Sequence, residues 1–253
     1  MVFKASKIIR LESVDSTNDY LYSILDNNAL PEGSVVYAHT QNQGKGQANN
    51  IWESEPGKNL TCSLVLYPEF LKPENQFLLT MVVSLSVCST IEKLQLPYPA
   101  MIKWPNDIYL QDKKVAGILI KNEILGRSIS KTIIGIGLNI NQLKFSELIP
   151  NPTSLKLISG IDYSVNDLLT ECHNNLKIWY QKLKNGETEF IEQSYMNRFY
   201  LLNEPALFEI KGRRIKAEIK GLAEFGMLHL EGPDKEEYIC DLKEIVFIPR
   251  PKS

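Results

Sequence analysis

The alternation of apolar and polar positions predicts a run of strands and helices over the first 200 residues. Segments rich in β-branched and aromatic residues predict strands over 6–12, 33–40, 60–67, 100–104, 114–124 and 131–140. Apolar residues three and four positions apart predict a helix from Ser16. Pro73 is expected to open a helix over 73–94 that is apolar over most of its surface and therefore buried, and further helices are predicted over 164–184 and 188–200. The segment 41–50 has no apolar residue except Ala48, which predicts a long, mobile loop.

Serine followed three residues later by an acid marks the start of two of these helices. Ser16 precedes Asp19, and Ser164 precedes Asp167. This spacing is typical of a capping box, in which the serine hydroxyl accepts a free backbone N–H of the first turn. The helix that begins at Ser164 is expected to end at Asn185-Gly186, where glycine can adopt the left-handed cap.

The pattern changes after Leu202, where no helical period is visible. Five short apolar segments follow, separated by Gly, Pro and charged residues: EPALFEI, RRIKAEIKGL, MLHLE, EEYICD and EIVFI. Five short strands in roughly fifty residues predict a small barrel or sandwich. A domain boundary is therefore expected near residue 200, with one domain over 1–200 and a second over 201–253.

Composition and charge narrow the class of protein. The 253 residues include 28 Lys and Arg and 30 Asp and Glu, for a net charge of −2, which argues against a general nucleic-acid binder. Four cysteines without CxxC spacing and three scattered histidines argue against a structural zinc site. The N-terminus lacks a signal-peptide core, and no apolar run reaches the ~20 residues of a membrane span. We expect a soluble, cytoplasmic protein.

Two polar segments carry candidate chemistry. Gly44-Lys45-Gly46 offers backbone N–H groups and a cation to an anion, or it is simply a flexible surface turn; Trp52 shortly after it can form a ligand wall. The segment KWPND, 103–107, places a cation, an amide and a carboxylate at one strand end. Its alternative interpretation is an ordinary Pro-Asn-Asp turn.

Two neighbouring strands carry further candidates. Lys114 enters an otherwise apolar strand, so it is either snorkelling or functional. Gly117 in that strand, and Gly135 and Gly137 in the next, leave room for a flat ligand or for tight strand packing. Asn139 follows them and could hydrogen-bond such a ligand. Common nucleotide signatures are absent, because no GxxxxGK[ST] or GxGxxG is present.

Five segments occur in a fixed order: DSTND at 15–19, HTQNQGKGQ at 39–47 with Trp52, KWPND at 103–107, KKVAGIL at 113–119 and GIGLNI at 135–140. Together they resemble the biotin protein ligase family. The resemblance covers almost the whole chain, because the β-rich tail is similar to that family's C-terminal domain. It implies an α+β fold, with a mixed-sheet catalytic domain covered by helices, similar to class II synthetases, and then a small SH3-like β-barrel.

The resemblance also implies a two-step reaction. Biotin and ATP, with Mg²⁺, would form biotinyl-5′-AMP and pyrophosphate, and a lysine of a biotin carboxyl carrier domain of a carboxylase would then take the biotin. Attack of a carboxylate on a phosphate brings two anions together and therefore needs placed cations. The catalytic roles fall on Lys45, Lys114 and Asp107, with Mg²⁺ held only transiently with ATP, near Asp107.

The binding residues carry over position by position. Biotin binding is implied for Ser16, Thr17, Asn18, Gln41, Gly44, Lys45, Gly46, Gln47, Trp52, Lys114, Gly117 and Gly135. Binding of ATP and the adenylate is implied for Lys45, Gln47, Trp52, Lys103, Asn106, Lys114, Gly137 and Asn139.

The chain departs from the family pattern in two ways. Gln47 stands where the family loop usually has a second basic residue, so we expect the adenylate to be held less firmly. The DSTND segment begins within the first twenty residues, so we expect no N-terminal DNA-binding region and no nucleic-acid partner. A monomer or a weak homodimer is expected.

Two other functions stay open at this point. A lipoate or octanoate ligase or transferase has a related fold, and its transferase branches use a cysteine nucleophile. Cys62 and Cys88 lie in apolar surroundings, which favours buried structural thiols. A non-catalytic binding module is the other alternative, and the presence of Lys45, Lys114 and Asp107 together argues against it.

Overall fold

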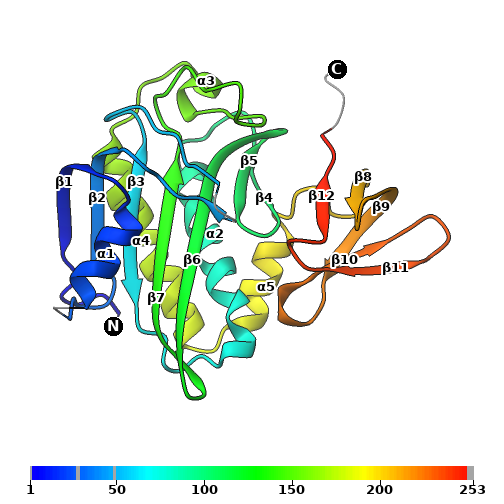
Figure 1. The fold of residues 1–253 in the computed structure, drawn as a ribbon, viewed down its shortest axis with the longest axis horizontal. Helices are drawn as coiled ribbons and strands as arrows, with labels where there is room; N and C mark the ends of the chain where they lie inside the picture. The colour runs from blue at the N-terminus through cyan, green and yellow to red at the C-terminus, as the bar shows by residue number, and fades with distance from the viewer. Residues whose placement is uncertain (1, 27–28, 48–49, 250–253) are drawn as a thin grey trace.

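A seven-stranded sheet forms the larger part of the molecule, with its strands in the order β1-β2-β3-β7-β6-β5-β4 (Figure 1). This computed structural model describes residues 2–26, 29–47 and 50–249, so Ala48 and Asn49 of the expected loop, and 250–253 of the expected tail domain, lie outside the described residues. The strands are β1 Ile8–Val14, β2 Val35–Gln41, β3 Leu60–Leu66, β4 Ala100–Lys103, β5 Asp107–Leu110, β6 Lys113–Leu125 and β7 Ser128–Leu138.

The sheet is mixed, as the resemblance implied. β1 and β2 run parallel, whereas the other neighbouring strands run antiparallel. β5 is a strand that the hydrophobic pattern does not predict, because it is short and directly follows the turn at Pro105. It lies between β4 and β6 and therefore carries Asp107 into the sheet.

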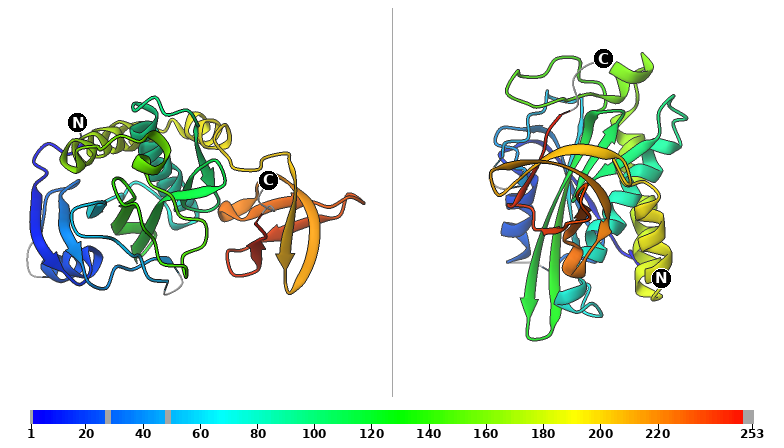
Figure 2. Two further views of the ribbon diagram at one scale, coloured as in Figure 1. Left: turned by 90° about the horizontal axis from the view of Figure 1, so that it is seen from above. Right: turned by 90° about the vertical axis from the view of Figure 1, so that its right-hand side faces the viewer.

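Side chains of β3 alternate between two apolar layers. Leu64 and Leu66 join the large core, whereas Val65 packs in a smaller cluster with Leu21. α2 Phe77–Glu92 and α4 Val165–Lys184 cover the first face, and α1 Thr17–Leu25 covers the second (Figure 2). Twelve of the 16 residues of α2 are buried, as its apolar surface predicts.

Both expected helix caps are present. The Ser16 hydroxyl accepts the backbone N–H of Asp19, and the Ser164 hydroxyl accepts that of Asp167 at 3.2 Å. Pro73 opens a 3₁₀ turn, η2 Pro73–Asn75, just before α2 rather than α2 itself. The remaining helices are α3 Leu155–Ser159, which the sequence does not predict, and α5 Thr188–Met196. No helix among the described residues is long and apolar enough to cross a membrane.

The C-terminal segment forms an antiparallel five-stranded sheet, in the order β11-β10-β9-β8-β12. Its elements are β8 Pro205–Ile210, β9 Arg213–Leu222, the 3₁₀ turn η3 Glu224–Gly226, β10 Leu228–Glu231, β11 Glu237–Cys240 and β12 Ile245–Phe247. The five expected strands are present. The expected closed barrel is not confirmed, because the edge strands β11 and β12 do not pair with each other among the described residues.

The C-terminal sheet packs against the end of β4, where the KWPND segment begins. The indole Nε1 of Trp104 donates to the carbonyl of Gly226 at 2.9 Å. Phe208 and Ile219 of the C-terminal sheet belong to the same apolar core as Ile102 of β4. The two sheets therefore share one core, and β4 lies on the side of the large sheet that faces the C-terminal sheet (Figure 1).

Candidate active site

A cavity of about 600 Å³ lies where the start of α1, the loop after β2, strands β5 to β7 and the segment 242–249 meet. Fifteen of the residues expected from the sequence line it: Ser16, Thr17, Asn18, Gln41, Lys45, Gly46, Gln47, Trp52, Lys103, Asn106, Asp107, Lys114, Gly117, Gly135 and Gly137. Gly44 and Asn139 do not. A cavity of this size suits a small organic ligand.

A directed chain of hydrogen bonds lies at the α1 end of the cavity. Gln41 Oε1 accepts from the backbone N–H of Thr17 at 2.8 Å and from its hydroxyl at 2.9 Å. Since the Thr17 proton is thereby used, the Ser63 hydroxyl donates to Thr17 Oγ1 at 2.8 Å. Ser63 in turn accepts from Asn18 Nδ2 at 2.9 Å. Asn18 Oδ1 is buried without a partner, so an acceptor remains at this end.

Ser63 is a site residue that sequence reasoning missed. It is fully buried on β3, behind Thr17 and Asn18, and does not line the cavity itself. The available signal was a single serine within the apolar strand segment LTCSLVL. A buried hydroxyl needs partners, and here the partners are the two polar residues that open α1.

Glycines on β6 and β7 form a floor for the Trp52 indole. Gly117 and Gly137 are cross-strand partners, and a Cβ added to Gly137 would collide with the indole ring. A Cβ on Gly135 would collide with the Asn18 amide. Both positions therefore require glycine for close approach, and the side chains of Trp52 and Asn18 occupy the space that the missing Cβ atoms leave.

Gly44 supports Trp52 from the other side. Its carbonyl accepts the Trp52 backbone N–H at 2.9 Å, and a Cβ there would collide with the Trp52 carbonyl oxygen. Lys45 pairs with Ile51 in an isolated antiparallel bridge. The segment from Gly44 to Trp52 is therefore folded back on itself at the cavity, although Ala48 and Asn49 in it are not described.

Two oppositely charged pairs involve the expected catalytic lysines. Lys114 Nζ lies 2.7 Å from Asp107 Oδ1, and these side chains are 28% and 23% exposed. The Lys114 ammonium also lies 5.8 Å from the Trp52 ring centroid. Lys45 forms an ion pair with Asp19, on the first turn of α1. Among the described residues that line the cavity, Asp107 is the one with a carboxylate.

The backbone around Lys114 is held by a neighbouring segment. The Lys114 N–H donates to Asn151 O at 2.8 Å, and its carbonyl accepts from Thr153 N at 2.9 Å. Asn139 Nδ2 donates to the Thr153 carbonyl at 3.0 Å, while its buried Oδ1 has no partner. Asn139 therefore positions this segment from behind the cavity wall.

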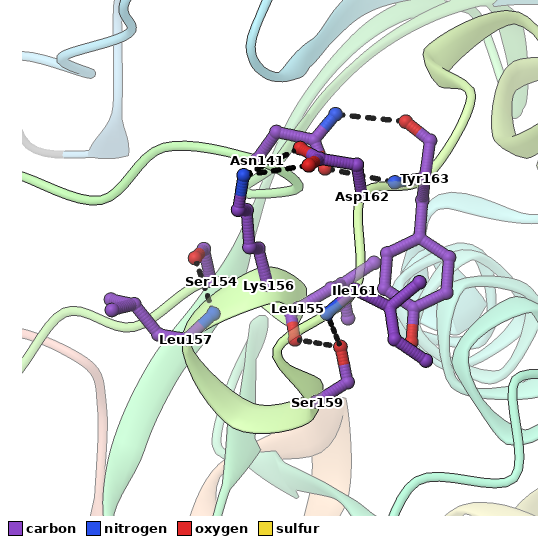
Figure 3. Close-up of polar contacts among 9 residues, drawn as sticks. All are labelled: Asn141, Ser154, Leu155, Lys156, Leu157, Ser159, Ile161, Asp162 and Tyr163. Carbon is purple, nitrogen blue, oxygen red and sulfur yellow. Dashed lines mark hydrogen bonds and ion pairs between the residues drawn. The ribbon is translucent and has the colours of Figure 1, made fainter.

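The same segment continues into α3, where polar contacts fix its shape (Figure 3). Asn141 forms two hydrogen bonds with the backbone of Tyr163, at 2.8 and 3.0 Å. The Lys156 ammonium contacts both carboxylate oxygens of Asp162 at 2.8 and 2.7 Å. Ser154 caps the short helix by accepting the N–H of Leu157 at 3.2 Å.

Lys103 lines the cavity from the end of β4, which three strands separate from β3, the strand that α1 packs against. Its ammonium donates to the Tyr109 hydroxyl at 3.2 Å and lies 5.2 and 4.9 Å from the ring centroids of Tyr109 and Phe247. Burial lowers the pKa of Lys103, opposed by the nearby charge of Asp107. Phe247 belongs to β12, so the C-terminal sheet contributes to the cavity, which sequence reasoning did not predict.

Asn106 is held by the backbone of β6. Its Nδ2 donates to the Ile118 carbonyl, and its own carbonyl accepts from Ile118 N at 3.1 Å. The peptide bond between Trp104 and Pro105 is cis, and the Tyr195 hydroxyl donates to the Pro105 carbonyl at 3.0 Å. Hydrogen bonds with the backbone of Ile118 and with the Tyr195 hydroxyl therefore hold the KWPND turn in place.

Among the described residues, Cys62 and Cys88 are poor candidates for a nucleophile, and no cluster of metal ligands is present. Cys62 lines the cavity, but burial raises the pKa of its thiol well above the usual value, and burial also raises the pKa of the Cys88 thiol. A protonated buried thiol is a poor nucleophile. Within the described ranges, no group of three or more His, Cys, Asp or Glu residues could hold a metal ion.

Comparison with known proteins shows the family to which this chain belongs and supports its fold. The family model described as the biotin/lipoate A/B protein ligase family matches residues 11–139, which is about half of the chain. The chain therefore belongs to that family. The chain is 35% identical over 157 residues to the bifunctional ligase/repressor BirA of Bacillus spizizenii, covering 60% of this chain and 47% of that relative.

Two further proteins are similar over nearly their whole length. The biotin–[acetyl-CoA-carboxylase] ligase of Paracoccus denitrificans is 25% identical, covering 90% of this chain and 96% of that protein. The structure of the biotin protein ligase from Aquifex aeolicus in complex with biotin and ATP is 27% identical, with a TM-score of 0.80, covering 98% of this chain and 100% of that one. The chain spans about half the length of the Bacillus relative.

Proposed function

We propose that this chain is an ATP-dependent biotin–protein ligase. The observation that carries the proposal is one cavity that brings the Thr17–Gln41 hydrogen-bonded pair together with the cations Lys45 and Lys114. The first element suits a small neutral polar group, such as the ureido ring of biotin, and the cations suit its carboxylate and a phosphate. Similarity to a ligase structure that contains biotin and ATP supports the proposal.

In the first step, a biotin carboxylate oxygen attacks the α-phosphorus of ATP, and the bond to the pyrophosphate oxygen breaks. Two anions approach each other in this step, so Lys45 and Lys114 are positioned to stabilise the charge that develops. Mg²⁺ that arrives with ATP would neutralise the pyrophosphate leaving group. The Asp107 carboxylate in the cavity is a suitable ligand for this ion, because Mg²⁺ is commonly bound by one or two carboxylates plus substrate phosphates.

In the second step, a lysine amine of a carrier domain attacks the biotinyl carbonyl carbon, and the bond to AMP breaks. An acyl-adenylate hydrolyses in water, so the site must exclude solvent until the amine arrives. The folded-back segment that carries Lys45 and Trp52 lies at the cavity and can serve this purpose. The carrier is expected to be the biotin carboxyl carrier domain of a carboxylase.

We further propose a finer organisation. Residues 1–200 form the catalytic domain, and residues 201–253 form a domain related to SH3-like barrels. All four cysteines are free and buried, which fits a reducing compartment such as the cytoplasm. A monomer or weak homodimer without a nucleic-acid partner remains the expected form.

The test is biotin-dependent ATP–pyrophosphate exchange by the purified chain with Mg²⁺. Exchange with biotin, followed by a mass increase of one biotinyl group on an added carrier domain, is the expected result. Exchange with lipoate alone would instead assign the related lipoate ligase activity. Lys114→Met, which removes the cation at Asp107 while leaving a stem of similar length, should abolish exchange.

A further inference from the structure

Lys45 is engaged by a carboxylate that does not line the cavity. Its ammonium forms an ion pair with Asp19 Oδ2, and the two side chains are 49% and 47% exposed. Asp19 lies on the first turn of α1, where Ser16 accepts its backbone N–H. The helix that carries Thr17 and Asn18 into the cavity therefore also holds the counter-ion of Lys45.

A second lysine shares the same carboxylate. Lys121 Nζ lies 3.9 Å from Asp19 Oδ1, so Asp19 is placed between two cations. Lys121 is on β6, four residues after Gly117, and therefore projects from the same face of the strand as that cavity residue. Its side chain is 51% exposed, and it does not line the cavity.

The proposed reaction makes Lys45 the cation that must reach an anionic ligand. Its loop, residues 41–50, has one basic side chain, because every other residue of QNQGKGQANN is uncharged. An ammonium has three donors and can share them, but a carboxylate beside it competes for the charge. Half-exposed ion pairs are weak, so this competition is expected to change ligand retention by roughly two- to fivefold.

We propose that Asp19 is a positioning residue that competes with the biotinyl-adenylate phosphate for Lys45 and so limits how long this intermediate is retained. This inference rests on the proposed function. Lys121 weakens this competition, because its ammonium also attracts the Asp19 carboxylate, which then binds Lys45 less strongly. Asp19 thus sets the retention of the intermediate through Lys45, without touching the reacting atoms.

The first test is Asp19→Asn, which removes the charge and keeps the backbone N–H that Ser16 accepts. Release of preformed biotinyl-AMP should become two- to fivefold slower in this variant at low salt, and the difference should shrink at high salt. Asp26→Asn, at the other end of α1, makes the same change in net charge and should leave release unchanged. Equal or faster release from Asp19→Asn would refute the proposal.

The second test is Lys121→Gln, for which competition predicts the opposite sign. Release should become faster in the otherwise natural chain, and it should not change when Asp19→Asn is already present. If the effects of the two substitutions on the release rate are additive, each residue acts on the ligand independently through its own charge. That result would refute the proposed competition between Asp19 and the phosphate. If the unaltered chain forms no biotinyl-AMP, the proposed function fails and this inference with it. Normal formation with unchanged release in Asp19→Asn refutes this inference alone.

Discussion

The ammonium of Lys103 lies 4.9 Å from the centroid of the Phe247 ring, so the C-terminal sheet directly contacts a cation that lines the cavity. Tyr109 covers the same ammonium from β5 at 5.2 Å. Lys103 ends a strand of the large sheet, β4, and Phe247 ends a strand of the small one, β12. The two sheets therefore build the phosphate side of the proposed site together.

Phe247→Leu removes the ring and keeps an apolar side chain. A cation–π contact contributes about 0.5–2 kcal/mol, so we expect the KM for ATP in pyrophosphate exchange to rise roughly 2- to 30-fold. The affinity for biotin should not change, because the proposed biotin-binding end of the cavity is formed around the Thr17–Gln41 pair. Phe247→Tyr, which keeps an aromatic ring, should leave the KM for ATP unchanged. Leu207→Ala, an exposed position on β8 of the same sheet, is the control, and an equal effect there would contradict the assignment.

The lowered pKa of Lys103 predicts a dependence of stability on pH. Burial disfavours the charged form, so below the folded pKa the ammonium destabilises the fold. Between that lowered pKa and the unfolded value near 10.5, the unfolded chain binds more protons, and stability from this group rises with pH. Lys103→Met removes the penalty, so its gain in unfolding free energy should be largest near pH 7 and should decline toward pH 10.

Urea unfolding at pH 7 and pH 10 measures this difference. Lys113→Met, at an exposed position that begins β6, controls for the loss of one positive charge. A gain for Lys103→Met that is constant with pH, or that grows with pH, would contradict the assigned cause.

Ser63→Ala tests the buried hydrogen-bond chain behind Thr17 and Asn18. The substitution leaves Asn18 Nδ2 and Thr17 Oγ1 without their common partner, which costs about 1–3 kcal/mol of stability. Biotin affinity, measured by calorimetry, should fall roughly tenfold, while the KM for ATP stays unchanged. Ser84→Ala is the matched control, because Ser84 is equally buried but its hydroxyl has no partner. Similar losses in both variants would refute a role for Ser63.

Most of the elements were predictable because each has a strong local signal. The serine caps of α1 and α4 and the apolar surface of α2 depend on residues close together in the chain. β5 was not predictable, because a four-residue strand after a turn has too short a pattern. The open edges of the C-terminal sheet depend on which strands pair, and local sequence does not determine that pairing.

The residues of the candidate site also differ in whether the sequence alone could predict them. Lys45, Lys114 and Asp107 stand in unusual short motifs, so their shared place at one cavity was predictable. Ser63 and Phe247 sit in ordinary strand sequences and reach the site only through tertiary contacts. Asn139 carries a motif position but does not line the cavity, and its amide donates instead to the carbonyl of Thr153, whose N–H donates to the Lys114 carbonyl.

Gly137→Ala tests the close approach between β7 and Trp52. The added Cβ would collide with the indole, and overpacking of this kind costs about 1–3 kcal/mol. We expect a lower melting temperature and a loss of adenylate formation. In the Trp52→Ala background the space is free, so the same substitution should no longer reduce stability. A stability loss that is equal in both backgrounds would show that the indole is not what Gly137 accommodates.

Gln47→Arg tests whether the loop lacks a cation that it could use. Gln47 lines the cavity beside Lys45, and its loop is folded back through the Gly46 N–H, which donates to Asn50 O at 2.7 Å. An arginine there can make charge-assisted hydrogen bonds to the adenylate phosphate, worth about 1.5–3 kcal/mol. Release of biotinyl-AMP should therefore slow roughly ten- to a hundredfold. Gln47→Met, which has similar size and no charge, should not slow it. Equal release from Gln47→Arg and the natural chain would mean that Lys45 and Lys114 already hold the phosphate fully, and that the neutral side chain at Gln47 does not weaken retention.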